Sequence, residues 1–121
     1  MKKKILVVDD DAEITMIVED ILKHHNYQVI VAHDGLQAIE KSNQEKVDII
    51  LLDICMPFFS GFWFCDAFKK RPQTQHIPVI VVSALSDENN IKKAYQMGAS
   101  AYLKKPFSSG ELLEVIEKAV A

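Results

Sequence analysis

Short, largely apolar runs rich in branched residues recur along the chain, and an amphipathic segment follows each of them. The runs cover residues 4–8, 27–32, 47–52, 77–82 and 101–103. A strand that is apolar at consecutive positions must be buried on both faces, which is typical of a parallel sheet covered by helices on both sides. The pattern therefore favours a fold in which strands and helices alternate.

The segments between these runs have the spacing of amphipathic helices. After the first run, apolar residues fall at positions 14, 17, 18, 21 and 22, which form one helical face. Further helices are expected at residues 36–42, 61–70, 87–97 and 109–120. Gly98 stands where helices commonly end on glycine, and Ser108 and Glu111 have capping-box spacing. Alternating strands and helices predict one doubly wound α/β domain over residues 1–121.

Charge and composition exclude several classes of function. The net charge of -3 gives no basic footprint for nucleic acid. No apolar run approaches the roughly 20 residues needed to cross a bilayer, and the lysines at positions 2–4 precede too short an apolar stretch for a signal peptide. Cys55 and Cys65 are too few for a disulfide framework. We therefore expect a cytoplasmic domain with reduced thiols and no direct contact with nucleic acid or membrane.

Chemically active side chains follow four of the five expected strands. These are Asp9, Asp10 and Asp11 after the first, Asp53 after the third, Ser83 after the fourth and Lys105 after the fifth. In doubly wound folds, ligands bind outside the carboxyl ends of the strands. Carboxylate oxygens suit Mg²⁺, while an ammonium and a hydroxyl can hold an anion. Such a set around one carboxylate is what transfer of a phosphoryl group onto that carboxylate requires.

Several of these residues also have ordinary structural explanations. Asp11 is expected to cap the following helix rather than to bind a metal. Ser83 alone could be a turn residue, and Lys104 is expected to face solvent, since only one of two adjacent side chains can point into the site. Asp53 is harder to explain in this way, because a largely apolar strand carries it into a crevice.

A series of short motifs runs from one end of the chain to the other. They are ILVVDD at 5–10, LLDICMP at 51–57, SG at 60–61, VVSA at 81–84, GA at 98–99 and YLKKPF at 102–107. With these motifs the chain resembles the receiver domain of two-component response regulators, including the single-domain chemotaxis type. The resemblance implies a flavodoxin-like (βα)5 fold with a five-stranded parallel sheet of strand order 2-1-3-4-5.

The resemblance also implies a role for each residue of the site. Asp53 would be the phosphoacceptor and take the phosphoryl group from the phosphohistidine of a sensor histidine kinase or a histidine phosphotransfer protein. Asp9 and Asp10 would hold Mg²⁺ together with Asp53 and the backbone carbonyl of Cys55. Lys105 would contact the phosphoryl oxygens. Such a domain catalyses its own phosphorylation and dephosphorylation without being a conventional turnover enzyme.

A conformational switch is the second implication of the resemblance. The Ser83 hydroxyl would move toward the aspartyl phosphate, and Tyr102 would rotate into the vacated space. The surface of the fourth helix, fifth strand and fifth helix would then control a downstream effector or output domain. Pro106 often follows a cis peptide bond in this family, which would aim Lys105 at the site. A homodimer is among the assemblies left open.

Three other functions compete with this interpretation. A flavin electron carrier of similar architecture is disfavoured, because the acids at positions 9–11 would repel the flavin phosphate. A phosphatase with an aspartyl nucleophile usually has an acid two residues later, where this chain has Cys55. A degenerate receiver that binds partners without phosphorylation stays as the alternative, although the acidic, hydroxyl and lysine positions are intact.

Two features depart from the family pattern. Cys55 lies where side chains border the phosphoryl group and its attacking water, and a thiol there leaves the lifetime of the phosphorylated state open. Phe58 and Phe59 replace a loop that is commonly more polar in this family.

A helical wheel places Phe64, Cys65 and Phe68 toward the sheet, and Trp63 on the opposite side with Asp66, Lys69 and Lys70. Trp63 either covers the Phe58–Phe59 loop or joins an exposed patch that binds a partner or a second copy.

Overall fold

A five-stranded parallel sheet forms the centre of the computed structural model, which describes residues 2–85 and 87–120. Residues 1, 86 and 121 of the predicted domain lie outside the described part. The sheet contains β1 (Lys4–Val8), β2 (Gln28–Ala32), β3 (Ile49–Asp53), β6 (Val79–Ser83) and β7 (Ala101–Lys104) in the order β2-β1-β3-β6-β7. This confirms the predicted order 2-1-3-4-5, since β6 and β7 are the fourth and fifth strands of this sheet.

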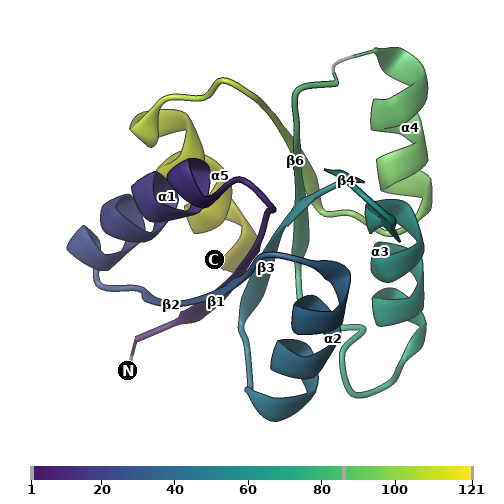
Figure 1. The fold of residues 1–121 in the computed structure, drawn as a ribbon, viewed down its shortest axis with the longest axis horizontal. Coiled ribbons are helices and arrows are strands. Elements are labelled where there is room, and N and C mark those ends of the chain that lie inside the picture. Colours follow the sequence, from purple (N-terminus) through teal and green to yellow (C-terminus); the bar gives the residue numbers. More distant parts are fainter. Residues whose placement is uncertain (1, 86, 121) are drawn as a thin grey trace.

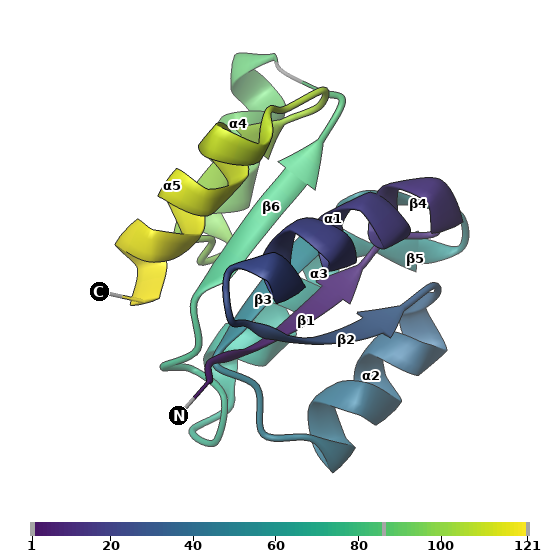
Figure 2. The ribbon, with the colours of Figure 1, turned by 90° about the vertical axis from the view of Figure 1, so that its left-hand side faces the viewer.

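Helices cover both faces of the sheet, as predicted (Figure 1). On one side are α1 (Ala12–His24) and α5 (Ser109–Val120); on the other are α2 (Gly35–Gln44), α3 (Gly61–Lys70) and α4 (Glu88–Gln96). Figure 2 shows the strands running in a common direction behind α1. None of the helices in the described residues is long and apolar enough to span a membrane.

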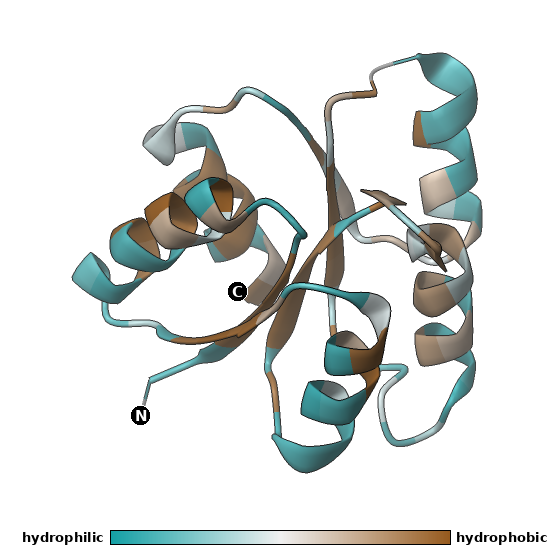
Figure 3. Cartoon of the chain, in the orientation of Figure 1, coloured by the Kyte–Doolittle hydropathy of each residue, from teal (hydrophilic) through white to brown (hydrophobic). Residues whose placement is uncertain are grey.

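The two faces of each strand belong to two separate layers of core. In β1, Leu6 and Val8 pack into the layer under α2, α3 and α4, whereas Ile5 and Val7 pack into the layer under α1 and α5. Successive side chains of a strand point to opposite faces, so continuous apolar runs fill both layers. The strands are accordingly the most hydrophobic part of the ribbon (Figure 3). The strands are therefore buried on both faces, as predicted for a parallel sheet covered by helices on both sides.

The ends of three helices follow the sequence signals. The Asp11 carboxylate accepts a hydrogen bond from the N–H of Glu13 at 3.0 Å, so Asp11 is the N-cap of α1 as predicted. Ser108 and Glu111 bond each other's backbone N–H groups ahead of α5, which confirms the capping box. Gly98 has a φ of 104° just after α4, a conformation that favours glycine.

The inward face of α3 is also as predicted. Phe64, Cys65 and Phe68 are buried, and the rings of Phe64 and Phe68 stack with centroids 5.5 Å apart. Trp63 is 58% exposed on the outer side. The placement of Lys69 beside Trp63 was wrong, because the Lys69 ammonium turns inward and donates to backbone carbonyls beyond the helix.

A small hairpin between β3 and α3 was not predicted. It pairs β4 (Cys55–Met56) with β5 (Phe59–Ser60), and Pro57 and Phe58 form its turn. Phe58 is fully exposed and has a φ of 56°, a left-handed conformation that is rare for a bulky residue. Trp63 therefore does not cover Phe58, and this part of the predicted lid was wrong. A contact of Trp63 with the rest of the loop stays a prediction.

Phe59 points the other way from Phe58. Its ring lies 5.7 Å from that of Phe64, and it fills the space where a Cβ at Gly35 would lie. Phe59 is therefore part of the core between α2 and α3 rather than of an exposed patch. Of the three aromatic residues considered for this patch, Phe58 and Trp63 are exposed.

Candidate functional site

The parallel strands end together, and this brings the predicted residues to one edge of the sheet. The register pairs Val8 with Leu52, Asp53 with Val82, and Ser83 with Lys104. The residues that end or directly follow these strands, Asp9, Asp53, Ser83 and Lys105, are therefore neighbours in space although far apart in sequence. This edge is where doubly wound folds bind ligands.

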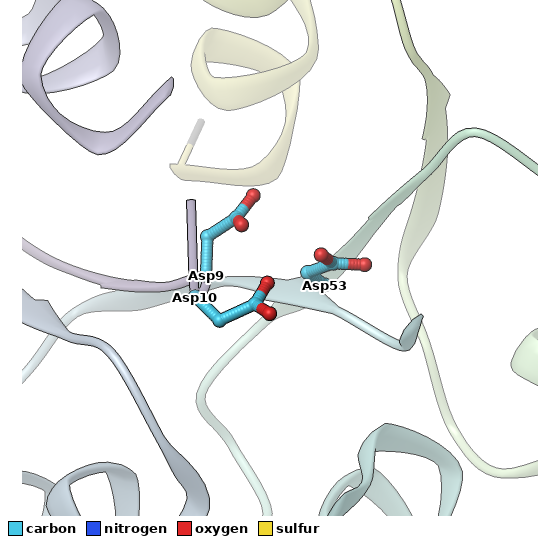
Figure 4. A group of neighbouring side chains, drawn as sticks. All are labelled: Asp9, Asp10 and Asp53. Atoms are coloured by element: carbon cyan, nitrogen blue, oxygen red, sulfur yellow. The ribbon is translucent and has the colours of Figure 1, made fainter. Parts of the chain in front are cut away.

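Asp9, Asp10 and Asp53 form an acidic cluster at this edge (Figure 4). Each contributes a carboxylate oxygen, and these oxygens all lie within 4.8 Å of one another. Asp9 and Asp53 are buried, whereas Asp10 is exposed. Three carboxylates at such distances repel one another unless cations neutralise them. An all-oxygen set that is open to water on one side fits Mg²⁺, which usually keeps several water ligands.

Lys105 supplies a positive charge next to the cluster. Its Nζ donates to Asp9 Oδ2 at 2.7 Å and to Asp53 Oδ2 at 3.3 Å. Burial lowers the pKa of Lys105, but the hydrogen bond to Asp9 and the charges of Asp53 and Asp9 outweigh it, so the pKa lies above its ordinary value. Lys105 therefore stays a cation at neutral pH. Lys104 is exposed, as predicted, and the Lys105–Pro106 peptide bond is cis.

The Asp53 carboxylate is held in a poorly hydrated position. Burial raises the pKa of Asp53. The Cys55 N–H, which lies 2.9 Å from Asp53 Oδ1, and the charge of Lys105 both lower this pKa. Because burial outweighs them, the pKa of Asp53 lies above its ordinary value. A carboxylate that has lost water without full compensation gains more from a new bond to a cation or an electrophile than a hydrated one does. The strand thus delivers a carboxylate suited to either bond.

Ser83 and Tyr102, the two predicted switch residues, are connected through the backbone of Leu85. Ser83 is fully buried, and its Oγ accepts a hydrogen bond from Leu85 N at 3.0 Å. The Tyr102 hydroxyl donates to Leu85 O at 2.6 Å. Sequence reasoning missed Leu85, because an apolar residue that acts through its backbone leaves no signal in residue type.

Cys55 lies beside both Asp53 and Ser83. Cys55 is an exposed residue, and its sulfur lies 3.6 Å from Ser83 Oγ. The described contact to Asp53 is made by the Cys55 N–H, and the metal-binding role of the Cys55 carbonyl stays a prediction. No disulfide joins the two cysteines, and their reduced state stays a prediction.

His33 is a second residue that sequence reasoning missed. It follows β2 directly, and its Nδ1 lies 3.2 Å from the backbone oxygen of Asp9. Its place at the carboxyl end of the second strand was an available signal, since the other residues of the site lie at equivalent ends.

Comparisons with known proteins show which family has this sequence pattern and fold. The family model of the response regulator receiver domain matches residues 5–117. The transcriptional regulatory protein CpxR of Escherichia coli K12 is 40% identical over 110 residues, which are 91% of this chain and 46% of CpxR. The alkaline phosphatase synthesis transcriptional regulatory protein PhoP of Bacillus subtilis 168 is 37% identical over 112 residues, which are 93% of this chain and 46% of PhoP.

A solved structure extends the similarity to the whole chain. The chemotaxis protein CheY4 of Vibrio cholerae superposes with a TM-score of 0.93 at 28% sequence identity, over 98% of this chain and 99% of CheY4. The chain thus spans about half the length of the curated relatives described above and nearly all of this structural one.

Proposed function

The chain belongs to the response regulator receiver domain family, and from this premise we propose that it is a phosphorylation-dependent signalling switch with Asp53 as its phosphoacceptor. The observation that carries the proposal is the buried Asp53 carboxylate, with Asp9 and Asp10 on one side and the Lys105 ammonium 3.3 Å away. An acidic cluster with one fixed cation is suited to receiving a phosphoryl group once a divalent cation offsets its remaining charge.

In this proposal, Asp9, Asp10, Asp53 and the backbone carbonyl of Cys55 hold Mg²⁺. The bound ion supplies charge neutralisation for the carboxylates and the incoming phosphoryl oxygens. The donor set supports the choice of ion, because all its atoms are hard oxygens and the Asp10 side is open to water.

The transfer step needs little covalent chemistry from the protein. An Asp53 oxygen forms a bond to phosphorus while the phosphorus–nitrogen bond of the donor phosphohistidine breaks. The imidazole nitrogen leaves with the bonding electron pair and takes up a proton. Lys105, which contacts Asp53 at rest, can then pair with a phosphoryl oxygen. Because the chain modifies its own side chain, we regard it as a phosphoacceptor rather than a turnover enzyme.

The hydrogen bonds around Leu85 give the phosphoryl group a route to the surface. The new phosphoryl oxygens are strong acceptors for the Ser83 hydroxyl, which in the described state accepts from Leu85 N. Movement of Ser83 toward them removes this bond and frees the loop to which Tyr102 is bound. We propose that Tyr102 then turns inward and that the population shifts to a second arrangement of the α4, β7 and α5 surface.

The partners follow from the same site. We propose a sensor histidine kinase or histidine phosphotransfer protein as donor, docked in the apolar hollow beside Lys105. Ile14, Ile17, Val18, Ala84, Pro106 and Phe107 complete the lining of this hollow. The signal would pass from the α4-β7-α5 surface to an effector protein or an output domain, in the cytoplasm where such kinases phosphorylate their partners. A homodimer would be one form of that output.

The experiment that tests the proposal is incubation with Mg²⁺ and acetyl phosphate, followed by intact mass spectrometry. We expect one added phosphoryl group, which is absent after chelation of Mg²⁺ and in Asp53→Asn. Persistent phosphorylation of Asp53→Asn would refute the assignment. Partner binding without any phosphorylation, from either acetyl phosphate or a phosphorylated kinase domain, would favour the degenerate receiver instead.

A further inference from the structure

Asp10 is the exposed member of the acidic cluster, and its position depends on the backbone that carries it. Its carboxylate reaches within 4.8 Å of those of Asp9 and Asp53. Within residues 2–85 and 87–120, however, no hydrogen bond or ion pair to that carboxylate is present. The direction of the Asp10 side chain is therefore set by the orientation of the Asp9–Asp10 peptide unit, because rotation of this unit changes where the Asp10 Cβ points.

The Asp9 side chain and the Asp9 N–H are held by other parts of the molecule. Asp9 N donates to Ala32 O at 3.0 Å, which extends the ladder between β1 and β2. Asp9 Oδ1 accepts from Asp11 N at 2.9 Å, and Asp9 Oδ2 accepts from Lys105 at 2.7 Å. None of these bonds involves the carbonyl oxygen that belongs to the Asp9–Asp10 peptide unit.

That carbonyl oxygen is bound by His33. The distance from His33 Nδ1 to Asp9 O is 3.2 Å, and because a carbonyl can only accept, Nδ1 must carry the proton. The segment that holds the ring is itself fixed to α2, since the His33 N–H donates to Gln37 Oε1 at 2.8 Å. Gln37 in turn lies in the first turn of α2, where its N–H is capped by Asp34.

We infer that His33 is a positioning residue for the metal site. By donating to Asp9 O, it fixes the Asp9–Asp10 peptide unit and so keeps the Asp10 carboxylate directed at the cation position. His33 does not touch the cation; it acts through the backbone in the way that outer partners orient metal ligands. This inference rests on the proposed function, because it takes the Asp9, Asp10 and Asp53 cluster to be a Mg²⁺ site.

Calorimetric titration of the metal-free protein with Mg²⁺ tests this role. His33→Leu removes the donor and should weaken Mg²⁺ binding about three- to tenfold. His33→Asn places an N–H near the position of Nδ1 and should restore the affinity to within about twofold of wild type. His76→Leu is the matched control, because His76 is an exposed histidine preceding β6 at the opposite end of the sheet, and it should leave the affinity unchanged.

The titration separates failure of this inference from failure of the proposed function. If wild type binds Mg²⁺ and His33→Leu binds equally well, the inference is wrong and the metal site stands. If His33→Asn is as weak as His33→Leu, the donor is not what positions Asp10, and the inference is again wrong. If wild type binds no Mg²⁺, the proposed function and the inference fail together.

A spectroscopic measurement on wild type keeps the test independent of how the variants fold. Long-range ¹H–¹⁵N correlation spectra report which ring nitrogen of a neutral histidine carries the proton. We expect the Nδ1–H tautomer for His33, because Nδ1 faces a carbonyl oxygen. The Nε2–H tautomer would overturn the inference whatever the titration shows.

Discussion

The Lys105 ammonium lies 2.7 Å from the Asp9 carboxylate, although 96 positions separate the two residues. The contact exists because β1 and β7 end at the same edge of the sheet. The buried Asp9 carboxylate is therefore paired with a positively charged side chain of the same protein. Any other cation that binds Asp9 must therefore share this carboxylate with Lys105 or displace it.

This competition predicts opposite effects of Lys105→Met on metal binding and on phosphoryl transfer. Removal of the ammonium should strengthen Mg²⁺ binding about three- to tenfold, because the carboxylates are then less neutralised. Phosphorylation by acetyl phosphate should slow by about 100-fold or more, because one partner of the phosphoryl oxygens is lost. Calorimetry and an intact-mass time course measure the two effects.

Lys104→Met is the matched control, since Lys104 is the exposed neighbour of Lys105. It should change neither quantity. Wild-type phosphorylation rates in Lys105→Met would show that Lys105 has no part in the transfer.

The helices and strands of the sheet could be predicted because apolar residues recur in the sequence with the period of each element. The helices at 61–70 and 109–120 have the predicted bounds, and each predicted strand is present with small shifts at its ends. The site residues were predictable for a related reason. Parallel strands place their carboxyl ends together, so the residues at those ends must meet.

The remaining features depend on contacts that residue types do not encode. Leu85 acts through its backbone N–H and carbonyl, which no residue type marks. The place of His33 after the second strand was a signal, but its bond to the Asp9 backbone could not be read from residue types. The hairpin of β4 and β5 contains only two residues in each strand, too few for any periodicity. Phe58 is exposed and has a left-handed φ, whereas the Phe59 ring packs inward, and two identical neighbouring residues do not indicate which of them faces the core.

The raised pKa of Asp53 predicts that its carboxylate destabilises the metal-free fold. Its pKa is raised by burial, so its contribution to stability is complete below the ordinary Asp value of about 3.9 and is lost as the pH rises through the folded-state pKa. Asp53→Asn should therefore increase the free energy of unfolding at neutral pH. The gain should shrink as the pH falls toward about 4.

Urea denaturation in the presence of a chelator measures this difference. Glu40→Gln, at an exposed position of α2, controls for the loss of one negative charge and should have little effect. A less stable Asp53→Asn at neutral pH would contradict the prediction, since it would mean that Lys105 and the Cys55 N–H outweigh the burial of the charge.

The two cysteines should differ in reactivity. Cys55 is exposed, whereas Cys65 is 1% exposed and burial raises its pKa to about 11. Because the thiolate is the reactive form, a disulfide reagent at about pH 8 should label one thiol quickly in the native protein and the second only after denaturation. Cys55→Ser should abolish the quick reaction, and two quickly reacting thiols would contradict the described burial.

The same pKa gives a stability effect at alkaline pH. The neutral Cys65 thiol contributes stability that is complete below its ordinary pKa of 9.0 and is lost as the pH rises toward about 11. Wild type should therefore lose stability over this interval relative to Cys65→Ala. If the free energies of unfolding of the two proteins instead differ by the same amount from neutral to alkaline pH, the Cys65 thiol has the same pKa in the folded and unfolded states.

Phe58 should reduce the stability of the fold. It is fully exposed, so its ring gains little from burial, and its φ of 56° places a bulky side chain in the left-handed region. Glycine adopts this conformation without the contact between Cβ and the carbonyl oxygen that makes it unfavourable. Phe58→Gly should therefore increase the free energy of unfolding by about 1 kcal/mol.

Phe59→Ala is the matched comparison, because the adjacent ring packs against Phe64. It should decrease the free energy of unfolding by about 2 kcal/mol or more. Urea denaturation of both variants distinguishes the two environments. A Phe58→Gly variant that is less stable than wild type would contradict the prediction, since it would mean that the greater entropy of the unfolded chain outweighs relief of the left-handed conformation. An aromatic side chain that weakens its own domain and reaches only solvent is then best tested for contacts with a partner, by comparing partner binding of Phe58→Gly and wild type.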